Sequence, residues 1–410
     1  MAFDGRAKYM ALVALSLVYF LLSACTFNGL GVVLPYMVGE LGWNWATAGL
    51  GFTLLGMTCG LSGLLPALLI RRIGVARTVL LGGGVMMAGF ASLALTHSAA
   101  VYYLGTTLLG LGYSLCGTVP GLHVISHSFE NRASTAIGIY FTAGGLGSVF
   151  GPLLVYATQE LTDSWRLYWA AAAGAAMLFG LLAAFATAAN RARPAGAVET
   201  GAAGAAEEGG WPARAALRTP HYYVIVAAYS VFLLINTTLH GFAVQHLVES
   251  GLGMGAAAAA MSAVALVGAV GSTVAGIAGE KIGSRHLTMA SLGGLTIGTA
   301  ALATGASGPA VIIFVAGLGI GVGFSYVSTA KLLLDYFGKK ANLELYSIMT
   351  LISTVAAVGP AAGGVLRDRV GSFMPVFLIC TALGLALMLV LLWLRRPDRH
   401  LQPQAHPAAA

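Results

Sequence analysis

A polar segment from Asn190 to Pro220 divides this chain into two apolar halves that resemble each other. The segment is rich in Ala, Gly, Pro and charge, which is typical of a flexible linker. The halves align at an offset of 208 or 209 residues, which pairs Asn28 with Asn236, Ile73-Gly74 with Ile282-Gly283, and Gly151-Pro152 with Gly359-Pro360. Long internal repeats in an apolar chain are typical of secondary transporters built from two related bundles.

Composition places the halves in a membrane. Of the 410 residues, 58% are hydrophobic and only 9% are charged, with a mean hydropathy of +0.85. Such a chain has too little polar surface to cover a water-soluble globule. The net charge of +7 comes from basic residues placed singly or in pairs between apolar segments. This pattern favours a lipid partner over nucleic acid, for which we find no binding motif.

Apolar segments of spanning length predict twelve membrane helices, six in each half. We expect an all-α membrane protein with an N-terminal bundle at 1–189, a cytoplasmic linker at 190–220, a C-terminal bundle at 221–396 and a cytoplasmic tail at 397–410. The predicted spans are 9–38, 45–70, 78–97, 100–127, 133–158, 166–189, 222–247, 257–279, 287–305, 309–335, 345–366 and 373–394.

The distribution of basic residues predicts the orientation. If both termini are cytoplasmic, 17 Lys and Arg residues lie inside and three lie outside, with Lys331 near a helix end. The outside set is Arg166, Arg367 and Arg369. Cytoplasmic loops carry an excess of Lys and Arg, so we expect both termini in the cytoplasm.

Small residues and prolines mark the fifth and eleventh spans. Gly144, Gly145, Gly147 and Gly151 share one predicted helix, and Gly359, Gly363 and Gly364 share its repeat mate. Small residues let helix backbones approach closely, so we expect these helices to pack across the boundary between the halves. Pro152 and Pro360 predict bends.

Several local motifs resemble those of one transporter family. The segments 71–77 and 280–285 carry a basic, glycine-turn, basic pattern similar to the cytoplasmic loop signature of the major facilitator superfamily. Within it, Leu41-Gly42-Trp43-Asn44-Trp45 and the stretch from Ser128 to Gly138 resemble motifs of the monocarboxylate porters. The resemblance implies two six-helix bundles and proton-coupled transport of a small monocarboxylate such as L-lactate or pyruvate.

The chain also departs from that family. Mammalian members place a lysine on the first helix, where Asn28 stands here, and an aspartate and an arginine on the eighth, where this chain reads 268–272 as GAVGS. All 14 acidic residues fall in tails, loops or helix ends. No carboxylate is left at the membrane midplane to carry a proton.

Five polar residues inside the predicted spans are candidates for binding the substrate: Asn28, Tyr113, Asn236, His240 and Tyr326. Polar groups are expensive in hydrocarbon unless they face a cavity or a partner. Asn28 and Asn236 are repeat mates, and His240 follows Asn236 by four residues on the same helix face. The alternative for each residue is a packing or interhelical hydrogen-bonding role.

Histidine is the natural proton carrier here, because its ordinary pKa of about 6.5 lets it change charge near neutral pH. His240 is the first candidate and His123 the second. His123 is matched by the repeat to Lys331, which precedes Asp335 by four residues. Lys331 and Asp335 could instead supply charge at a cytoplasmic gate, or form a simple ion pair at a helix end.

The sequence therefore predicts a proton-coupled monocarboxylate carrier in the bacterial cytoplasmic membrane, working as a monomer by alternating access. The alternatives are an oxalate/formate-type anion exchanger, another major-facilitator carrier, and a non-transporting membrane sensor. An enzyme would need a catalytic cluster, and the sequence offers no such motif. Nothing in the sequence calls for a cofactor or a metal ion.

Overall fold

The computed structural model of the protein describes residues 2–129, 132–190 and 210–394 and is built from helices. No strand occurs in these ranges, where the only β-type pairing is an isolated bridge between Gly210 and Gly338. The predicted all-α class is confirmed. The predicted tail at 397–410 lies outside the described residues.

The N-terminal half begins with a long helix interrupted by one π-helical turn. Its elements are α1 (Ala2–Ser23), the π-helical turn η1 (Ala24–Asn28), α2 (Gly29–Leu41), α3 (Trp45–Leu61), α4 (Leu65–Ile73), α5 (Val75–Ala94), α6 (Ala99–Cys116), α7 (Thr118–Ser128), α8 (Ala133–Thr162) and α9 (Trp165–Ala189). A polar N-cap residue precedes several of these helices. Asn44 accepts a hydrogen bond from the amide of Thr47 at 2.8 Å, and Ser98 and Ser164 cap α6 and α9 in the same way.

The C-terminal half repeats this plan with one short helix in front. Its elements are α10 (Ala213–Ala216), α11 (Pro220–Glu249), α12 (Met254–Lys281), α13 (Ser284–Ala303), α14 (Gly308–Phe337), α15 (Asn342–Ser353), the 3-10 turn η2 (Thr354–Val358), α16 (Gly359–Val370) and α17 (Met374–Trp393).

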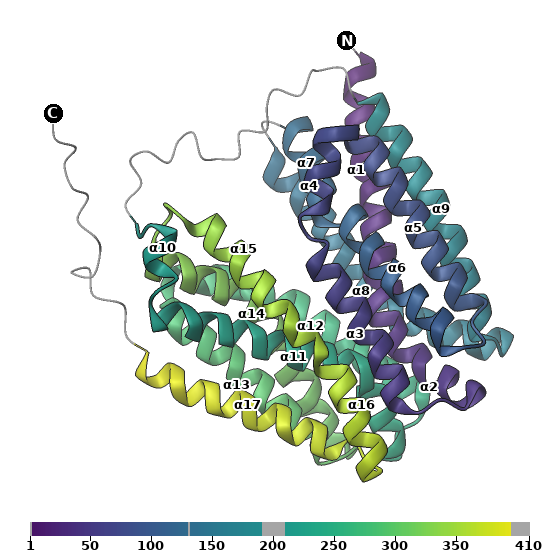
Figure 1. Ribbon diagram of the computed structural model, residues 1–410, viewed down its shortest axis with the longest axis vertical. Coiled ribbons are helices and arrows are strands. Elements are labelled where there is room, and N and C mark those ends of the chain that lie inside the picture. Colours follow the sequence, from purple (N-terminus) through teal and green to yellow (C-terminus); the bar gives the residue numbers. More distant parts are fainter. Residues whose placement is uncertain (1, 130–131, 191–209, 395–410) are drawn as a thin grey trace.

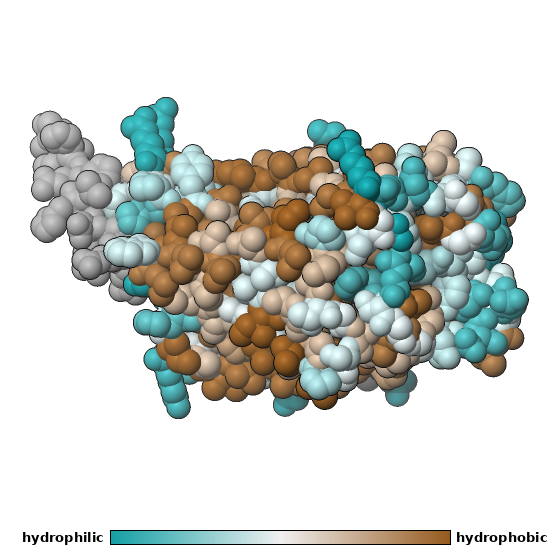
Figure 2. Space-filling model, turned by 90° about the horizontal axis from the view of Figure 1, so that it is seen from below, coloured by the Kyte–Doolittle hydropathy of each residue, from teal (hydrophilic) through white to brown (hydrophobic). Residues whose placement is uncertain are grey.

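Ten helices of the described chain are long and apolar enough to cross a membrane, or eleven when α3 and α4, bent by 53°, count as one span. The sequence predicts twelve. The remaining predicted span corresponds to α13, a helix of 20 residues that packs between α14 and α17. Figure 2 shows a broad belt of hydrophobic residues across the middle of one face, with hydrophilic residues gathered toward both ends. This is the surface of a protein that spans a bilayer.

The two halves meet at one end of the molecule and diverge toward the other (Figure 1). We call the first the closed end, where α2, the start of α3 and the end of α16 lie, and the second the divergent end, which carries the start of α1, α4, α7 and α10. Across the boundary, α3 packs on η2 and α16, α8 packs on α12, and α11 packs on η1 and α2. By contrast, α4, α7 and α10 make their main contacts within their own halves.

The described end of the predicted linker is packed rather than free. The indole of Trp211 is 3% exposed, its backbone amide donates to the carbonyl oxygen of Phe337 at 2.8 Å, and the two aromatic rings meet edge to face. Residues 210–219 therefore belong to the C-terminal half. The preceding residues 191–209 lie outside the described chain.

The glycine-rich helices only partly pack as expected. On α8, Gly144, Gly147 and Gly151 lie against α1 and η1 of the same half, and only Gly145 faces α12 across the boundary. On α16, Gly364 lies against the backbone of Trp45 in the other half. Pro152 lies inside the uninterrupted helix α8, whereas Pro360 follows η2, where the chain breaks its α-helical course.

Candidate functional site

The helices that carry the repeat mates Asn28 and Asn236 cross in direct contact. A side chain on Gly31 of α2 would overlap the backbone carbonyl oxygen of His240 on α11, so the two backbones touch at this point. α11 also contacts α12, α13, α14, α15, α16 and α17, which makes it the central helix of its half. The crossing thus lies on the boundary between the two halves.

His240 bridges the halves at this crossing. Its Nε2 lies 3.1 Å from Oδ1 of Asn28, and its Nδ1 lies 2.7 Å from the carbonyl oxygen of Asn236 one turn earlier. Both His240 and Asn28 are half-buried. Two of the predicted substrate residues and the first predicted proton carrier therefore come together in one hydrogen-bonded group.

The orientation of the Asn28 side chain is fixed from its other end. Its Nδ2 donates to the carbonyl oxygen of Ser23 at 2.8 Å, five residues earlier. The π-helical turn η1 lies within this interval, and π-type turns inside α-helices are frequent at functional sites. The amide oxygen of Asn28 therefore faces His240.

Asn236 contributes to this group through its backbone. Its side-chain oxygen Oδ1 is buried and has no hydrogen-bond partner. The repeat mates Asn28 and Asn236 are therefore not equivalent in the structure. Asn28 makes the contact between the halves, and Asn236 keeps an unused acceptor one turn from His240.

Two predicted tyrosines border the crossing through neighbouring aromatic rings. Tyr113 on α6 meets Phe27 edge to face, with ring centroids 5.8 Å apart, and Phe27 directly precedes Asn28. Tyr326 on α14 meets Phe232 edge to face at 4.9 Å, one turn before Asn236 on α11. Tyr326 is 47% exposed although it packs against the central helix of its half.

The remaining candidates lie at the divergent end. Nζ of Lys331 lies 3.4 Å from Oδ2 of Asp335 within α14, so the ion pair at a helix end is present. The ring of His123 on α7 lies 4.5 Å from that of His127, whose Nδ1 is 2.7 Å from the carbonyl oxygen of His123. The repeat pairs His123 with Lys331, but the contacts of the described residues do not join them.

The closed end holds contacts that the sequence does not reveal. The carboxylate of Asp368 on α16 accepts hydrogen bonds from the backbone amides of Trp45 and Ala46, at 3.0 and 2.8 Å. These amides begin α3, so a side chain of one half caps a helix of the other. Nearby, the amide of Ala361 donates to Oγ1 of Thr53 at 3.0 Å, again from half to half.

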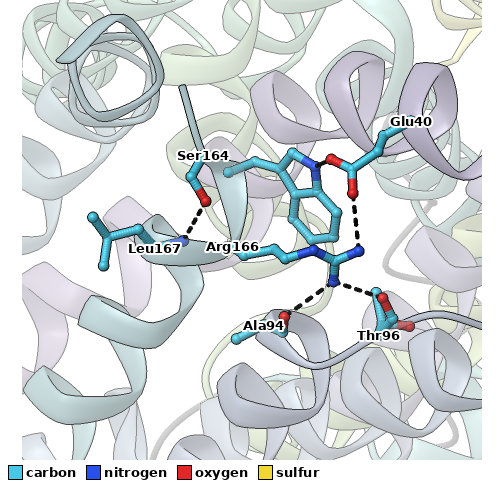
Figure 3. Close-up of polar contacts among 7 residues, drawn as sticks. Glu40, Ala94, Thr96, Ser164, Arg166 and Leu167 are labelled. Atoms are coloured by element: carbon cyan, nitrogen blue, oxygen red, sulfur yellow. Dashed lines mark hydrogen bonds and ion pairs between the residues drawn. The ribbon is translucent and has the colours of Figure 1, made fainter. Parts of the chain in front are cut away.

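A second cluster at this end stays within the N-terminal half (Figure 3). The guanidinium of Arg166 bridges the carboxylate of Glu40 at 3.0 Å and the carbonyl oxygens of Ala94 and Thr96, at 3.2 and 2.7 Å. The indole of Trp165 donates to the other oxygen of Glu40 at 2.5 Å. These contacts tie together the ends of α2, α5 and α9.

Sequence reasoning missed Ser23, Gly31 and Asp368. Ser23 acts through its carbonyl oxygen, and the role of Asp368 depends on a partner more than 300 residues away. The role of Gly31 could have been predicted, because the run Asn28-Gly29-Leu30-Gly31 places small residues within one helical turn of Asn28.

Taken together, two six-helix bundles related by a sequence repeat meet around a polar crossing near their shared boundary, which defines the chain as a multi-pass membrane protein of the transporter type. The chain belongs to the major facilitator superfamily, whose family model matches residues 15–268 and 227–410.

Among known proteins, the chain is 27% identical to Monocarboxylate transporter 11 of Mus musculus in an alignment of 356 residues that covers 77% of this chain and 71% of that protein. Its fold is similar to the crystal structure of the nucleoside transporter NupG, with a TM-score of 0.73 and 14% identity over 94% of this chain and 98% of the other. It is equally similar to a bacterial homologue of the human lysosomal transporter Spinster in an inward-facing, unoccupied conformation, with a TM-score of 0.73 and 16% identity over 94% and 95% of the two chains. The structures establish the fold, and the family and these neighbours are transporters.

Proposed function

We propose that this protein is a secondary carrier that moves a small monocarboxylate, such as L-lactate or pyruvate, together with a proton by alternating access. The likeness to a monocarboxylate transporter supports the cargo class, and the contact between His240 and Asn28 at the boundary of the halves supports the proton. In this proposal the protein works as a monomer in the bacterial cytoplasmic membrane. Both termini lie in the cytoplasm, so the closed end faces outward.

The single observation that carries the proposal is a titratable side chain placed where the halves meet. Alternating access requires the halves to rearrange about a central site, and a proton bound there can bias the rearrangement. The ion pairs Glu40–Arg166 and Lys331–Asp335 lie at helix ends and not at this crossing. His240 supplies the central group that can load and release a proton, and His123 is the second candidate.

The carboxylate of the cargo would be attracted by the charge of a protonated His240 and held by neutral donors. In this proposal the Asn28 and Asn236 amides and the Tyr113 and Tyr326 hydroxyls offer such donors. Neutral donors bind a carboxylate less strongly than guanidinium does, so affinity is expected to be modest.

The decisive experiment is uptake of labelled L-lactate into proteoliposomes under an imposed pH gradient, with and without internal counter-substrate. Acceleration by an inward proton gradient alone supports symport. Uptake that occurs only with internal oxalate, formate or lactate contradicts symport and supports anion exchange. Absence of uptake and of counterflow for all of these anions contradicts the cargo class.

The Tyr326→Phe variant tests the binding site, because it keeps the ring on Phe232 and removes only the hydroxyl. A lost hydrogen bond to a carboxylate is expected to weaken lactate affinity by about threefold to tenfold. The matched control is Tyr223→Phe, an exposed tyrosine near the start of α11. Unchanged affinity in Tyr326→Phe would remove this hydroxyl from the site.

A further inference from the structure

The hydrogen bonds around His240 favour one protonation state of its ring in this conformation. The carbonyl oxygen of Asn236 can only accept a hydrogen bond, so Nδ1 of His240 at 2.7 Å must carry a hydrogen. On the other side, Nε2 faces Oδ1 of Asn28 at 3.1 Å, and an amide oxygen also only accepts. With the Asn28 amide in this orientation both ring nitrogens donate, which is the arrangement of the imidazolium cation.

A flipped Asn28 side-chain amide could bind a neutral His240, but the flip would break another hydrogen bond of Asn28. Its Nδ2 already donates to the carbonyl oxygen of Ser23 at 2.8 Å. A turned amide would offer Nδ2 to a neutral His240, but its oxygen would then face the Ser23 carbonyl oxygen. A neutral His240 therefore leaves either the contact between the halves or the contact with Ser23 unmade.

We infer that the contact between His240 and Asn28 is a proton-dependent latch, which holds the two halves together at the crossing when His240 is protonated and loosens when it is neutral. Asn28 belongs to the N-terminal half and His240 to the C-terminal half. A hydrogen bond from a charged donor is typically stronger than a neutral one. Loss of the proton is therefore expected to reduce the population of the closed end by about tenfold or more.

Four charged groups on the helices around the crossing are engaged elsewhere. Glu249 on α11 pairs with Arg367 of α16, Glu40 on α2 pairs with Arg166, Lys331 on α14 pairs with Asp335, and Asp368 caps α3. Two other titratable side chains near the crossing are Cys25 on η1, which is buried, and Tyr168 on α9, which lies against Gly29. Neither carries charge near neutral pH in its ordinary state, so His240 is the group expected to titrate at the crossing.

This latch adds a mechanism of proton coupling to the proposed carrier function. It rests on that proposal for which end of the molecule faces the cytoplasm. With the closed end outward, a proton that reaches His240 from outside favours closure of that end and opening of the divergent end toward the cytoplasm. Release of the proton inside then weakens the latch and permits the return. This order of events is the one that inward proton-coupled uptake requires.

The test measures the conformation directly and needs no cargo. Nitroxide labels at Gly39→Cys and Val370→Cys report the spacing of the two halves at the closed end, because both positions lie there and are exposed. The full-length protein carries them in a background whose four native cysteines are replaced by serine, and distances are measured in nanodiscs from pH 5 to 8.5. In the wild-type background we expect a short distance between the two labels at low pH and a longer one at high pH. The change should follow the titration of a single proton.

Three variants separate the latch from a general effect of pH. Asn28→Ala removes the acceptor and is expected to lower the short-distance population at pH 5 by about tenfold and to flatten the pH curve. His240→Gln keeps a donor that does not titrate, so its curve should also be flat. The matched control is His246→Gln on the same helix, because Nε2 of His246 lies 2.9 Å from the carbonyl oxygen of Leu302 within its own half. This control should keep the wild-type curve.

A spectroscopic measurement tests the protonation state of His240 itself, whereas the pH dependence of the label distance in the wild-type background needs no variant of the crossing. Solid-state NMR of protein labelled with 15N-histidine distinguishes a doubly protonated ring from a neutral one. Comparison with the His240→Gln variant identifies the signal of His240. A neutral His240 ring in the short-distance state overturns the latch, as does a pH-independent distance in the wild-type background. Failure of lactate uptake with an intact pH transition would overturn the proposed cargo and leave the latch standing.

Discussion

At the closed end, some polar contacts join one half of the molecule to the other, whereas the contacts of Lys331 and Asn190 at the divergent end stay within a half. Asp368 caps α3 across the boundary, and His240 meets Asn28 farther along it. At the divergent end, Lys331 pairs with Asp335 on the same helix, and Asn190 donates to Ser128 within the N-terminal half at 2.6 Å. An alternating-access carrier needs this asymmetry, because only the end that is shut in a given state requires contacts between the halves.

The backbones differ between the ends in the same way. At the closed end, a side chain on Gly49 would overlap the carbonyl oxygen of Pro360, and one on Gly364 would overlap that of Trp45. At the divergent end, α4 packs on α5, α6 and α7 of its own half. Close backbone approach between the halves is therefore present at the closed end.

The largest effect is expected from a side chain inserted into the closed end. Gly49→Val places a branched group where the Pro360 carbonyl oxygen lies, and overpacking of this kind costs about 1–3 kcal/mol. The distance between labels at Gly39→Cys and Val370→Cys should lengthen at every pH, and any pH-gradient-driven uptake should fall by about tenfold or more.

The control for this variant is Gly145→Ala on α8, which lies at another contact between the halves. Its added methyl would meet only the side chain of Ala269, at 3.9 Å, which is ordinary contact. An equal loss in both variants would mean that the two contacts contribute alike, and the proposed difference between the ends would not hold.

A smaller effect is expected from Asp368→Asn. Asparagine keeps one acceptor for the amides of Trp45 and Ala46 and loses the charge that favours a helix N-terminus. Loss of a cap of this kind costs about 1 kcal/mol, which corresponds to a roughly fivefold lower population of the closed end. The distance between the labels at Gly39→Cys and Val370→Cys, taken at one pH, measures this population.

Glu249→Gln is the comparison for Asp368→Asn, because its partner Arg367 lies in the same half at 2.8 Å. It should leave the population of the closed end nearly unchanged. A larger shift in Glu249→Gln than in Asp368→Asn would show that the ion pair, and not the cap between the halves, holds this end.

The sequence predicts the fold well because the fold depends on patterns spread over many residues. Apolar segments of spanning length, the repeat around Asn190–Pro220 and the loop motifs each report on the architecture independently. Gly74, in the first predicted basic turn, adopts a φ of +84°, which glycine accommodates best. The same patterns do not show that α3 and α15 end before the span is complete, because the residues around those breaks remain apolar.

The candidate site was only partly predictable, because its partners are set by tertiary structure. A helix face shared by Asn236 and His240 follows from their spacing, but the pairing of His240 with Asn28 depends on how two helices cross. The repeat also misleads in places. It equates Asn28 with Asn236 and His123 with Lys331, although each member has its own contacts in the structure.

The smallest effect is expected at the divergent end, from Lys331→Gln. Lys331 and Asp335 are 32% and 21% exposed, and ion pairs of this kind contribute about 0–1 kcal/mol. Because both residues lie on α14, the pair does not hold the halves together, and the population of the closed end should change by less than about threefold. Its pH dependence should follow that of the unmodified protein. A double-mutant cycle with Asp335→Asn measures the pair itself. If Lys331→Gln flattens the pH curve as Asn28→Ala is expected to do, the charge that biases the halves lies at the divergent end and not at His240.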